Sequence, residues 1–202
     1  MQSPNSGRVT NLEFKILLVG EEGVGKTSLI RRFIENRFDE NSIPNLASPE
    51  SGYITTQLNL FGAPIKLQIQ DVEQVIWEDV VSYYLVDNDG ILIIFDASAK
   101  MKIRPYIDYW FQPIRQINSD IPVVVIGNKS DLTVKVNIKK IAQYCSKLGI
   151  NFIQTSAKTG DNVGYAFKLL TSEIVKAKAA AKKAAEGKRA DGLSNIFTRY
   201  DL

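Results

Sequence analysis

The stretch Gly20-Glu21-Glu22-Gly23-Val24-Gly25-Lys26-Thr27 follows a largely apolar run, residues 14–19, and together they decide the fold of this chain. The pattern G-x-x-x-x-G-K-[ST] between a buried strand and a helix is typical of a turn whose backbone N–H groups surround a polyphosphate. In such a turn Lys26 reaches the outer phosphates and the Thr27 hydroxyl holds a Mg²⁺ ion. We call residues 20–27 the phosphate loop. The ligand-binding residues expected here are Glu22, Gly23, Val24, Gly25, Lys26, Thr27 and Ser28.

The chain after the phosphate loop alternates between helix and strand patterns. Apolar residues recur at helical spacing in four segments: 28–36, 101–118, 138–148 and 163–175. Two uninterrupted apolar runs, 90–95 and 121–126, are typical of strands that helices cover on both faces. Shorter strands are expected at 53–60, 65–70 and 151–155, the first two as an antiparallel hairpin. The alternation predicts an α/β fold with a mostly parallel, doubly wound sheet.

The composition excludes several classes of chemistry. Apolar residues make up 45% and charged residues 23% of the 202 residues, as in an ordinary globular domain. The chain has no histidine, which excludes Ser-His-Asp and Cys-His nucleophiles. Its one cysteine, Cys145, rules out a disulfide framework and a Cys/His zinc site. We expect Cys145 to be a buried, small apolar residue.

Charge and hydropathy along the chain predict three parts and a cytoplasmic location. The formal charge of +3 is too small to indicate nucleic-acid binding, and the positive excess lies in residues 176–189, so we expect no nucleic-acid partner. No apolar run approaches the ~20 residues of a membrane span, and residues 1–10 lack the apolar centre of a signal peptide. We expect a flexible N-terminus (1–10), a nucleotide-binding domain (11–176) and a basic Ala/Lys-rich extension and tail (177–202). The extension is predicted to be helical to about Glu186, either as a solvated helix or as a docking arm for an acidic surface.

The stretch Asn128-Lys129-Ser130-Asp131, directly after an apolar strand, indicates which base is bound. A carboxylate at Asp131 can accept hydrogen bonds from the N1–H and the 2-amino group of guanine. Adenine lacks this pair of donors, so a buried carboxylate there discriminates strongly against it. We expect Asn128 to tie this loop to the phosphate loop and the Lys129 stem to lie on the purine face.

The stretch Thr155-Ser156-Ala157-Lys158 follows the next expected strand and supports the same choice of base. The residues predicted to contact the base here are Ser156, Ala157 and Lys158. Backbone N–H groups of the last two are placed to meet the guanine carbonyl oxygen. An ATP-using P-loop kinase is disfavoured, because these two stretches indicate guanine and no lid-like arginine cluster is evident.

In their order along the chain, these motifs resemble those of the small GTPases of the Ras superfamily, over about residues 14–174. The stretches IKLQIQD, Ser82-Tyr83-Tyr84, IGNKSDL and TSAKTGDNV resemble the Rab branch most. The resemblance implies a Ras-like P-loop NTPase fold with a six-stranded sheet and five helices. It also implies Mg²⁺-dependent binding of GTP or GDP, and two nucleotide-sensing switch loops through which effector or regulatory proteins bind, residues 38–52 and 72–84. Phe38 is then placed against the guanine edge.

The sequence departs from the family pattern where the γ-phosphate is sensed. The family motif D-T-A-G-Q is replaced by Asp71-Val72-Glu73-Gln74-Val75, which keeps the Mg²⁺-side aspartate but lacks the glycine. Either Gln74, our candidate catalytic residue, or Glu73 takes the place of the water-orienting glutamine. A glutamate there is unfavourable beside the γ-phosphate. Glu22 stands where the family usually has a small residue, and should crowd this glutamine if it points inward.

Two further departures concern the metal and the membrane. In the first switch loop, either Asn45 or Ser48 could stand in for the Mg²⁺-binding threonine. With Ser48 in that place, the predicted metal ligands are Thr27, Asp71 and Ser48. The sequence ends Tyr200-Asp201-Leu202, without the prenylated cysteines in which Rab-type proteins usually end, so we expect membrane contact only indirectly and no lipid anchor.

The motifs expected to bind the base and the phosphates are therefore intact, whereas the residues expected to act in GTP hydrolysis depart from the family pattern. We predict a Rab-like GTP-binding protein that regulates intracellular trafficking or assembly and hydrolyses GTP slowly. The alternative is a non-switching scaffold or structural subunit that keeps GTP or GDP as a cofactor.

Overall fold

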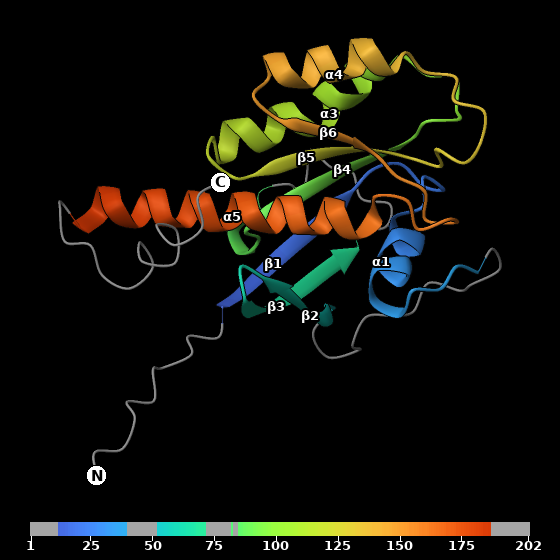
Figure 1. The fold of residues 1–202 in the computed structure, drawn as a ribbon. Coiled ribbons are helices and arrows are strands. Elements are labelled where there is room, and N and C mark those ends of the chain that lie inside the picture. The colour runs from blue at the N-terminus through green and yellow to red at the C-terminus, as the bar shows by residue number, and fades with distance from the viewer. Residues whose placement is uncertain (1–11, 40–51, 72–81, 83–84, 187–202) are drawn as a thin grey trace.

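The computed structural model describes residues 12–39, 52–71, 82 and 85–186 of the chain. Its centre is one six-stranded sheet in the order β2-β3-β1-β4-β5-β6 (Figure 1). The strands are β1 Leu12–Val19, β2 Ile54–Leu60, β3 Ala63–Asp71, β4 Gly90–Asp96, β5 Val123–Asn128 and β6 Asn151–Gln154. β2 pairs with β3 antiparallel through a tight turn at Phe61 and Gly62, and all other pairs are parallel. The predicted fold class is confirmed.

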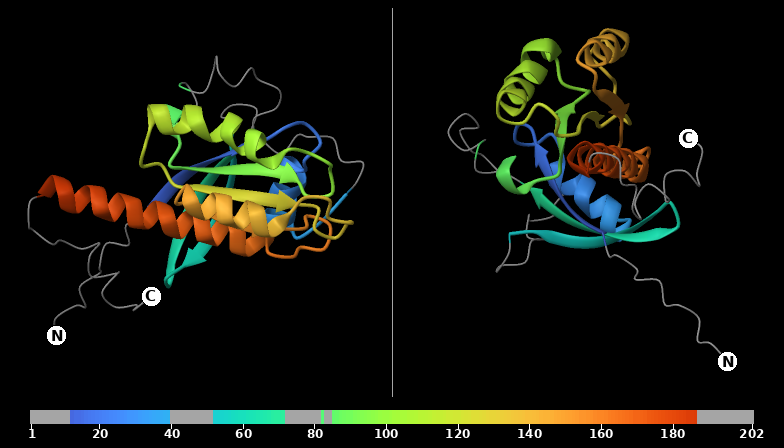
Figure 2. Two further views of the ribbon diagram at one scale, coloured as in Figure 1. Left: turned by 90° about the horizontal axis from the view of Figure 1, so that it is seen from above. Right: turned by 90° about the vertical axis from the view of Figure 1, so that its left-hand side faces the viewer.

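Helices cover both faces of this sheet. They are α1 Lys26–Glu35, α3 Ile103–Ile117, α4 Ile138–Lys147 and α5 Val163–Glu186. α1 and α5 lie on one face, and α3 and α4 lie on the other (Figure 2). The predicted helices agree with these to within two residues at most ends. Pro105 does not prevent α3, because it lies in the first turn, where a backbone N–H has no partner inside the helix. Pro113 lies inside α3, which continues past it.

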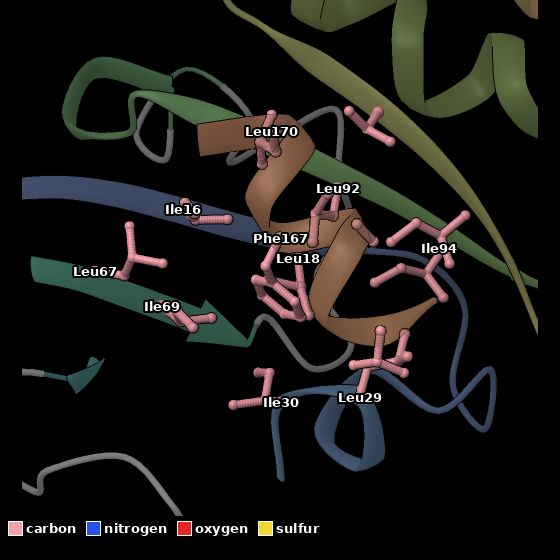
Figure 3. Close-up of a cluster of buried hydrophobic side chains, with 14 of the residues drawn as sticks. Ile16, Leu18, Leu29, Ile30, Leu67, Ile69, Leu92, Ile94, Phe167 and Leu170 are labelled. Atoms are coloured by element: carbon pink, nitrogen blue, oxygen red, sulfur yellow. The ribbon is translucent and has the colours of Figure 1, made fainter. Parts of the chain in front are cut away.

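Two apolar cores lie between the helices and the sheet. On one face, Leu29 and Ile30 of α1 and Phe167 of α5 meet the side chains of the central strands (Figure 3). Phe33 stacks on Phe167 with ring centroids 4.1 Å apart, which joins α1 to α5. On the other face, α3 and α4 bury the alternate residues of β4 and β5. Apolar burial on both faces explains why these strands are continuous apolar runs in the sequence.

Two expectations about the second half of the chain are confirmed. α5 continues unbroken to Glu186, and its last turns project beyond the sheet (Figure 2). Cys145 is fully buried in the core under α4, and burial raises the pKa of its thiol to about 11, so it remains a neutral thiol. Among the described residues, no helix has both the length and the apolar character that crossing a membrane requires.

The topology gathers the motifs at one edge of the sheet. β1, β3, β4, β5 and β6 all run in the same direction, so their carboxyl ends share this edge. The phosphate loop follows β1, Asp71 ends β3 and Asp96 ends β4. Residues 128–131 begin at the last residue of β5, and residues 155–158 follow β6. In open α/β sheets, ligands bind at this edge.

Candidate functional site

The phosphate loop depends on glycine for both its conformation and its close packing. Gly23 and Gly25 have φ angles of 75° and 96°, in the left-handed region that favours glycine. A Cβ atom on Gly25 would lie 2.5 Å from Asn128 Nδ2, and one on Gly20 would lie 2.2 Å from the Ile94 carbonyl oxygen. Gly20 and Gly25 therefore let the loop backbone lie directly against β4 and β5.

The Lys26 side chain is held by the backbone of the phosphate loop, to which it belongs. Its side chain is 6% exposed, and its ammonium donates hydrogen bonds to the carbonyl oxygens of Gly20, at 2.9 Å, and Glu21, at 3.0 Å. Burying a cation is costly unless it is hydrogen-bonded, and these two carbonyls provide that compensation. The result is a positive charge positioned against the loop backbone, where it can face an anion. The Glu22 side chain, by contrast, is exposed.

Two of the predicted metal ligands, Thr27 and Asp71, lie side by side. The Thr27 hydroxyl, in the first turn of α1, donates a hydrogen bond to the carboxylate of Asp71 at the end of β3. Mg²⁺ prefers such oxygen donors and commonly takes one or two protein ligands, the rest coming from water and phosphate. No group of three or more His, Cys, Asp or Glu side chains that could hold a metal ion occurs in the described part of the chain. Ser48 lies outside the described residues.

Asn128 joins three segments through its side-chain amide. Its Nδ2 donates to the Val24 carbonyl oxygen at 2.9 Å, which is the predicted link to the phosphate loop. Its Oδ1 accepts from the Ala157 N–H at 3.1 Å and from the Thr155 hydroxyl at 3.2 Å. Asn128 is 1% exposed, so each of these bonds satisfies a buried polar group.

Lys129 extends from the same strand end in an unusual backbone conformation. Its φ angle is 63°, and its ammonium lies 2.8 Å from the Asp96 carboxylate. Burial alone raises the pKa of Asp96, but hydrogen bonds from Lys129 and Ser98 outweigh that effect and hold the pKa below its ordinary value. Asp96 therefore stays ionised and fixes the head of the lysine. No role was predicted for Asp96 from sequence, although it follows an apolar run at the end of its strand.

Asp131 is placed differently from the expectation. We predicted a buried carboxylate, but Asp131 is exposed, because it lies on a turn beyond β5 at the open edge of the sheet. The hydroxyl of Ser156, which is fully buried, donates to Asp131 Oδ1 at 2.6 Å. This bond orients the carboxylate while leaving it accessible to a ligand at the edge of the sheet.

The Ala157 N–H is also placed differently. It was expected to meet the guanine carbonyl oxygen, but in the structure it donates to Asn128 Oδ1 at 3.1 Å. Ala157 is 3% exposed, and Lys158 is exposed. Ala157 thus fixes residues 155–158 to Asn128, and Lys158 lies on the solvent-exposed side of these residues.

Arg32 on α1 is a contributor to the site that sequence analysis missed. Its guanidinium donates to the carbonyl oxygens of Ala157, at 2.8 Å, Lys158, at 2.7 Å, and Asn36, at 2.7 Å. It thereby ties the end of α1 to residues 155–158. No local pattern marks an arginine at this helix position, since its partners lie far away in the sequence. Phe38, two residues after Asn36, is half-buried and packs against the α1–α5 core.

The described residues do not include Gln74 or Glu73, nor most of the two predicted protein-binding segments, 38–52 and 72–84. The predictions for these positions remain predictions.

A comparison with known protein families agrees with the geometry of the site. The protein-family model described as the Ras family matches residues 15–176, which is more than half of the chain. The match includes the phosphate loop, Asp71 and both segments that indicate guanine. Proteins of this family bind guanine nucleotide, generally with Mg²⁺. The resemblance to the Ras superfamily is confirmed, and the chain belongs to the Ras family of small GTP-binding proteins.

Proposed function

We propose that this protein is a Rab-like member of its family that holds GTP or GDP with Mg²⁺ and regulates intracellular trafficking or assembly. The observation that carries the proposal is the Asn128 side chain, which bonds the phosphate loop at 2.9 Å and the 155–158 segment at 3.1 Å. Residues for the phosphates and residues for the base therefore form one connected unit. The Rab-like assignment is supported by IKLQIQD, IGNKSDL and TSAKTGDNV in the sequence.

Each part of the nucleotide has a proposed set of residues. The phosphate loop and Lys26 bind the phosphates, and Thr27, Asp71 and Ser48 ligate Mg²⁺. Asp131 accepts the guanine donors, and Phe38 and the Lys129 stem flank the ring. Lys158 completes the carbonyl contact at the exposed side of its segment. The Lys129–Asp96 and Asp131–Ser156 pairs support the base assignments, because both orient a side chain before any ligand arrives.

Hydrolysis is proposed to be weak. Phosphoryl transfer depends on an oriented water and on stabilising the charge of the γ-phosphoryl group. Gln74 is the candidate that orients the water, but its neighbour Glu73 and the exposed Glu22 carry negative charge in the part of the sequence that meets the γ-phosphate. Negative charge there repels the phosphate oxygens and disfavours attack. Nucleotide affinity depends on other groups, so we expect it to be retained.

The nucleotide carried by freshly purified protein tests the proposal. The protein is denatured, and the released nucleotide is resolved by ion-pair chromatography. We expect guanine nucleotide at about one equivalent per chain, with GTP in substantial amount. Only GDP, together with turnover comparable to that of relatives stimulated by their activating proteins, would contradict weak hydrolysis. An empty site that stays empty after incubation with GTP and Mg²⁺ would contradict nucleotide binding.

A second function is supported by the altered sequence at residues 71–75. A non-switching scaffold would hold the nucleotide as a structural cofactor and bind its partner in either nucleotide state. Affinity capture with protein loaded with GDP or with a non-hydrolysable GTP analogue separates the two functions. A partner captured only with the GTP analogue supports a regulator. A partner captured equally in both states, and lost when residues 38–52 are exchanged, supports the scaffold.

A further inference from the structure

Tyr106 connects helix α3 to the phosphate loop through its hydroxyl group. The residue lies in the second turn of α3 and is 8% exposed. Its hydroxyl donates to the Ile94 carbonyl oxygen on β4 at 2.6 Å and accepts from the Glu21 N–H at 3.0 Å. The same oxygen therefore bonds a central strand and the phosphate loop.

The peptide unit between Gly20 and Glu21 carries this contact to Lys26. Its N–H group bonds to Tyr106, and its carbonyl oxygen, that of Gly20, accepts from the Lys26 ammonium at 2.9 Å. A peptide unit is planar, so fixing the direction of the N–H also fixes the direction of the carbonyl. Lys26, the peptide unit, Tyr106 and Ile94 form one series of hydrogen bonds, in which each bond polarises the next.

The Gly20–Glu21 peptide unit is closely packed against β4 and the Tyr106 hydroxyl. A Cβ atom on Gly20 would lie 2.2 Å from the Ile94 carbonyl oxygen and 3.1 Å from the Tyr106 hydroxyl, so the loop is pressed against both. Burial raises the pKa of the Tyr106 phenol far above its ordinary value, so the group remains a neutral donor and acceptor. Without the hydroxyl, the Glu21 N–H and the Ile94 carbonyl would both lose their partner.

We propose that Tyr106 is a positioning residue for nucleotide binding, because it orients the Gly20–Glu21 peptide unit that holds the Lys26 ammonium toward the outer phosphates. Tyr106 acts through this peptide unit and does not itself touch the nucleotide. The proposal rests on the nucleotide binding proposed above. It predicts that α3, which contributes no residue to the sequence motifs, contributes to affinity for the phosphates.

The variant Tyr106→Phe tests the proposal, with Tyr144→Phe as the matched control. Phenylalanine keeps the buried ring and removes only the hydroxyl. Tyr144 also donates a hydroxyl hydrogen bond, to Asp108 between α4 and α3, but it does not contact the phosphate loop. Affinity for a fluorescent GDP analogue with Mg²⁺, and its rate of release into excess GDP, are measured for wild type and both variants. Leaving a buried N–H without its partner should weaken binding by Tyr106→Phe roughly ten-fold, with faster release, while Tyr144→Phe stays within about two-fold.

Two spectroscopic measurements separate positioning from general destabilisation. The ³¹P resonance of the β-phosphate of bound GDP should shift in Tyr106→Phe, and the guanine N1–H proton resonance should not. In wild type, the Glu21 amide should be protected from hydrogen exchange, a result that needs no variant. Thermal unfolding of each variant shows whether it is folded.

Three outcomes would overturn the proposal. The first is a Tyr106→Phe protein that binds GDP as tightly as wild type, even if its thermal stability is lower. The second is a Glu21 amide that is not protected from hydrogen exchange. If wild-type protein bound no guanine nucleotide at all, the proposed function would fail first and this inference with it. That result differs from the case in which wild type and variant bind equally well.

Discussion

The base side and the γ-phosphate side of the site differ in how their residues are held. On the base side, buried Asn128 and Ser156 make hydrogen bonds that join residues 128–131, 155–158 and the phosphate loop. On the γ-phosphate side, Asp71 still bonds to Thr27, but the next residues depart from the family motif and Glu22 is exposed. Affinity and turnover depend on different groups. A chain can therefore retain the first while altering the second.

The largest expected effect comes from removing the amide that unites the base side. Asn128→Ala leaves the Val24 carbonyl, the Ala157 N–H and the Thr155 hydroxyl without their shared partner in a buried site. We expect a loss of about 3 kcal/mol in the free energy of unfolding and a loss of nucleotide binding. Urea denaturation and a GDP titration measure the two quantities.

Asn137→Ala is the control for that variant. Asn137 caps α4 by accepting from the Lys140 N–H, away from the nucleotide segments, so its loss should cost about 1 kcal/mol of stability and no GDP affinity. If both variants bound GDP normally, the base side would not depend on Asn128 and the contrast between the two sides would fail.

The next effect concerns the choice of base. Asp131→Asn replaces an acceptor-only carboxylate with an amide that suits xanthine better than guanine. We expect GDP affinity to fall by about 2 kcal/mol, with xanthosine diphosphate preferred, in competition titrations. Asp161→Asn removes a similar exposed carboxylate, which accepts from Thr159, and should change neither affinity. An Asp131→Asn protein that still preferred GDP would show that this carboxylate does not read the base.

A smaller effect tests the γ-phosphate side alone. Glu22→Gly combined with a glycine inserted after Val72 brings the sequence closer to the family pattern. Single-turnover GTP hydrolysis should rise roughly ten-fold, and GDP affinity should stay within about two-fold. Glu21→Gln removes a neighbouring exposed charge and should leave hydrolysis unchanged. A parallel rise or fall of affinity and turnover would contradict the separation of the two sides.

The smallest effect is the pH dependence of the Lys129–Asp96 pair. The pKa of Asp96 lies below its ordinary value of 3.8 in the folded protein, so the ionised carboxylate stabilises the fold above that pH. This stabilisation is lost as the pH falls through the lower, folded-state pKa. Because both groups are partly exposed, we expect less than about 1 kcal/mol. The difference in unfolding free energy between wild type and Asp96→Asn should shrink as the pH falls below the ordinary pKa of 3.8. A difference that did not change with pH would rule out this contribution.

The order of helices and strands was predictable from sequence, because it depends on local periodicity and on turn residues. The uniform apolar runs at 90–95 and 121–126 predicted strands covered on both faces, and the structure has β4 and β5 there. The motifs also predicted which residues gather at the carboxyl edge, because parallel strands bring their ends together. The link from Asn128 to the phosphate loop follows from that topology and is present.

Only the tertiary structure decided how these residues are partnered and which distant side chains support them. Pairing of β4 with β5 sets Asp96 opposite Asn128, and Asp96 can then hold Lys129. The exposure of Asp131 and the bond from the Ala157 N–H to Asn128 depend on the relative positions of two loops. Tyr106 and Arg32 reach residues 85 and 125 positions away in the chain. Sequence alone therefore determined the elements, the family motifs and the departures from them. The fold decided the contacts, because hydrogen bonds between distant segments depend on register and packing that no local pattern records.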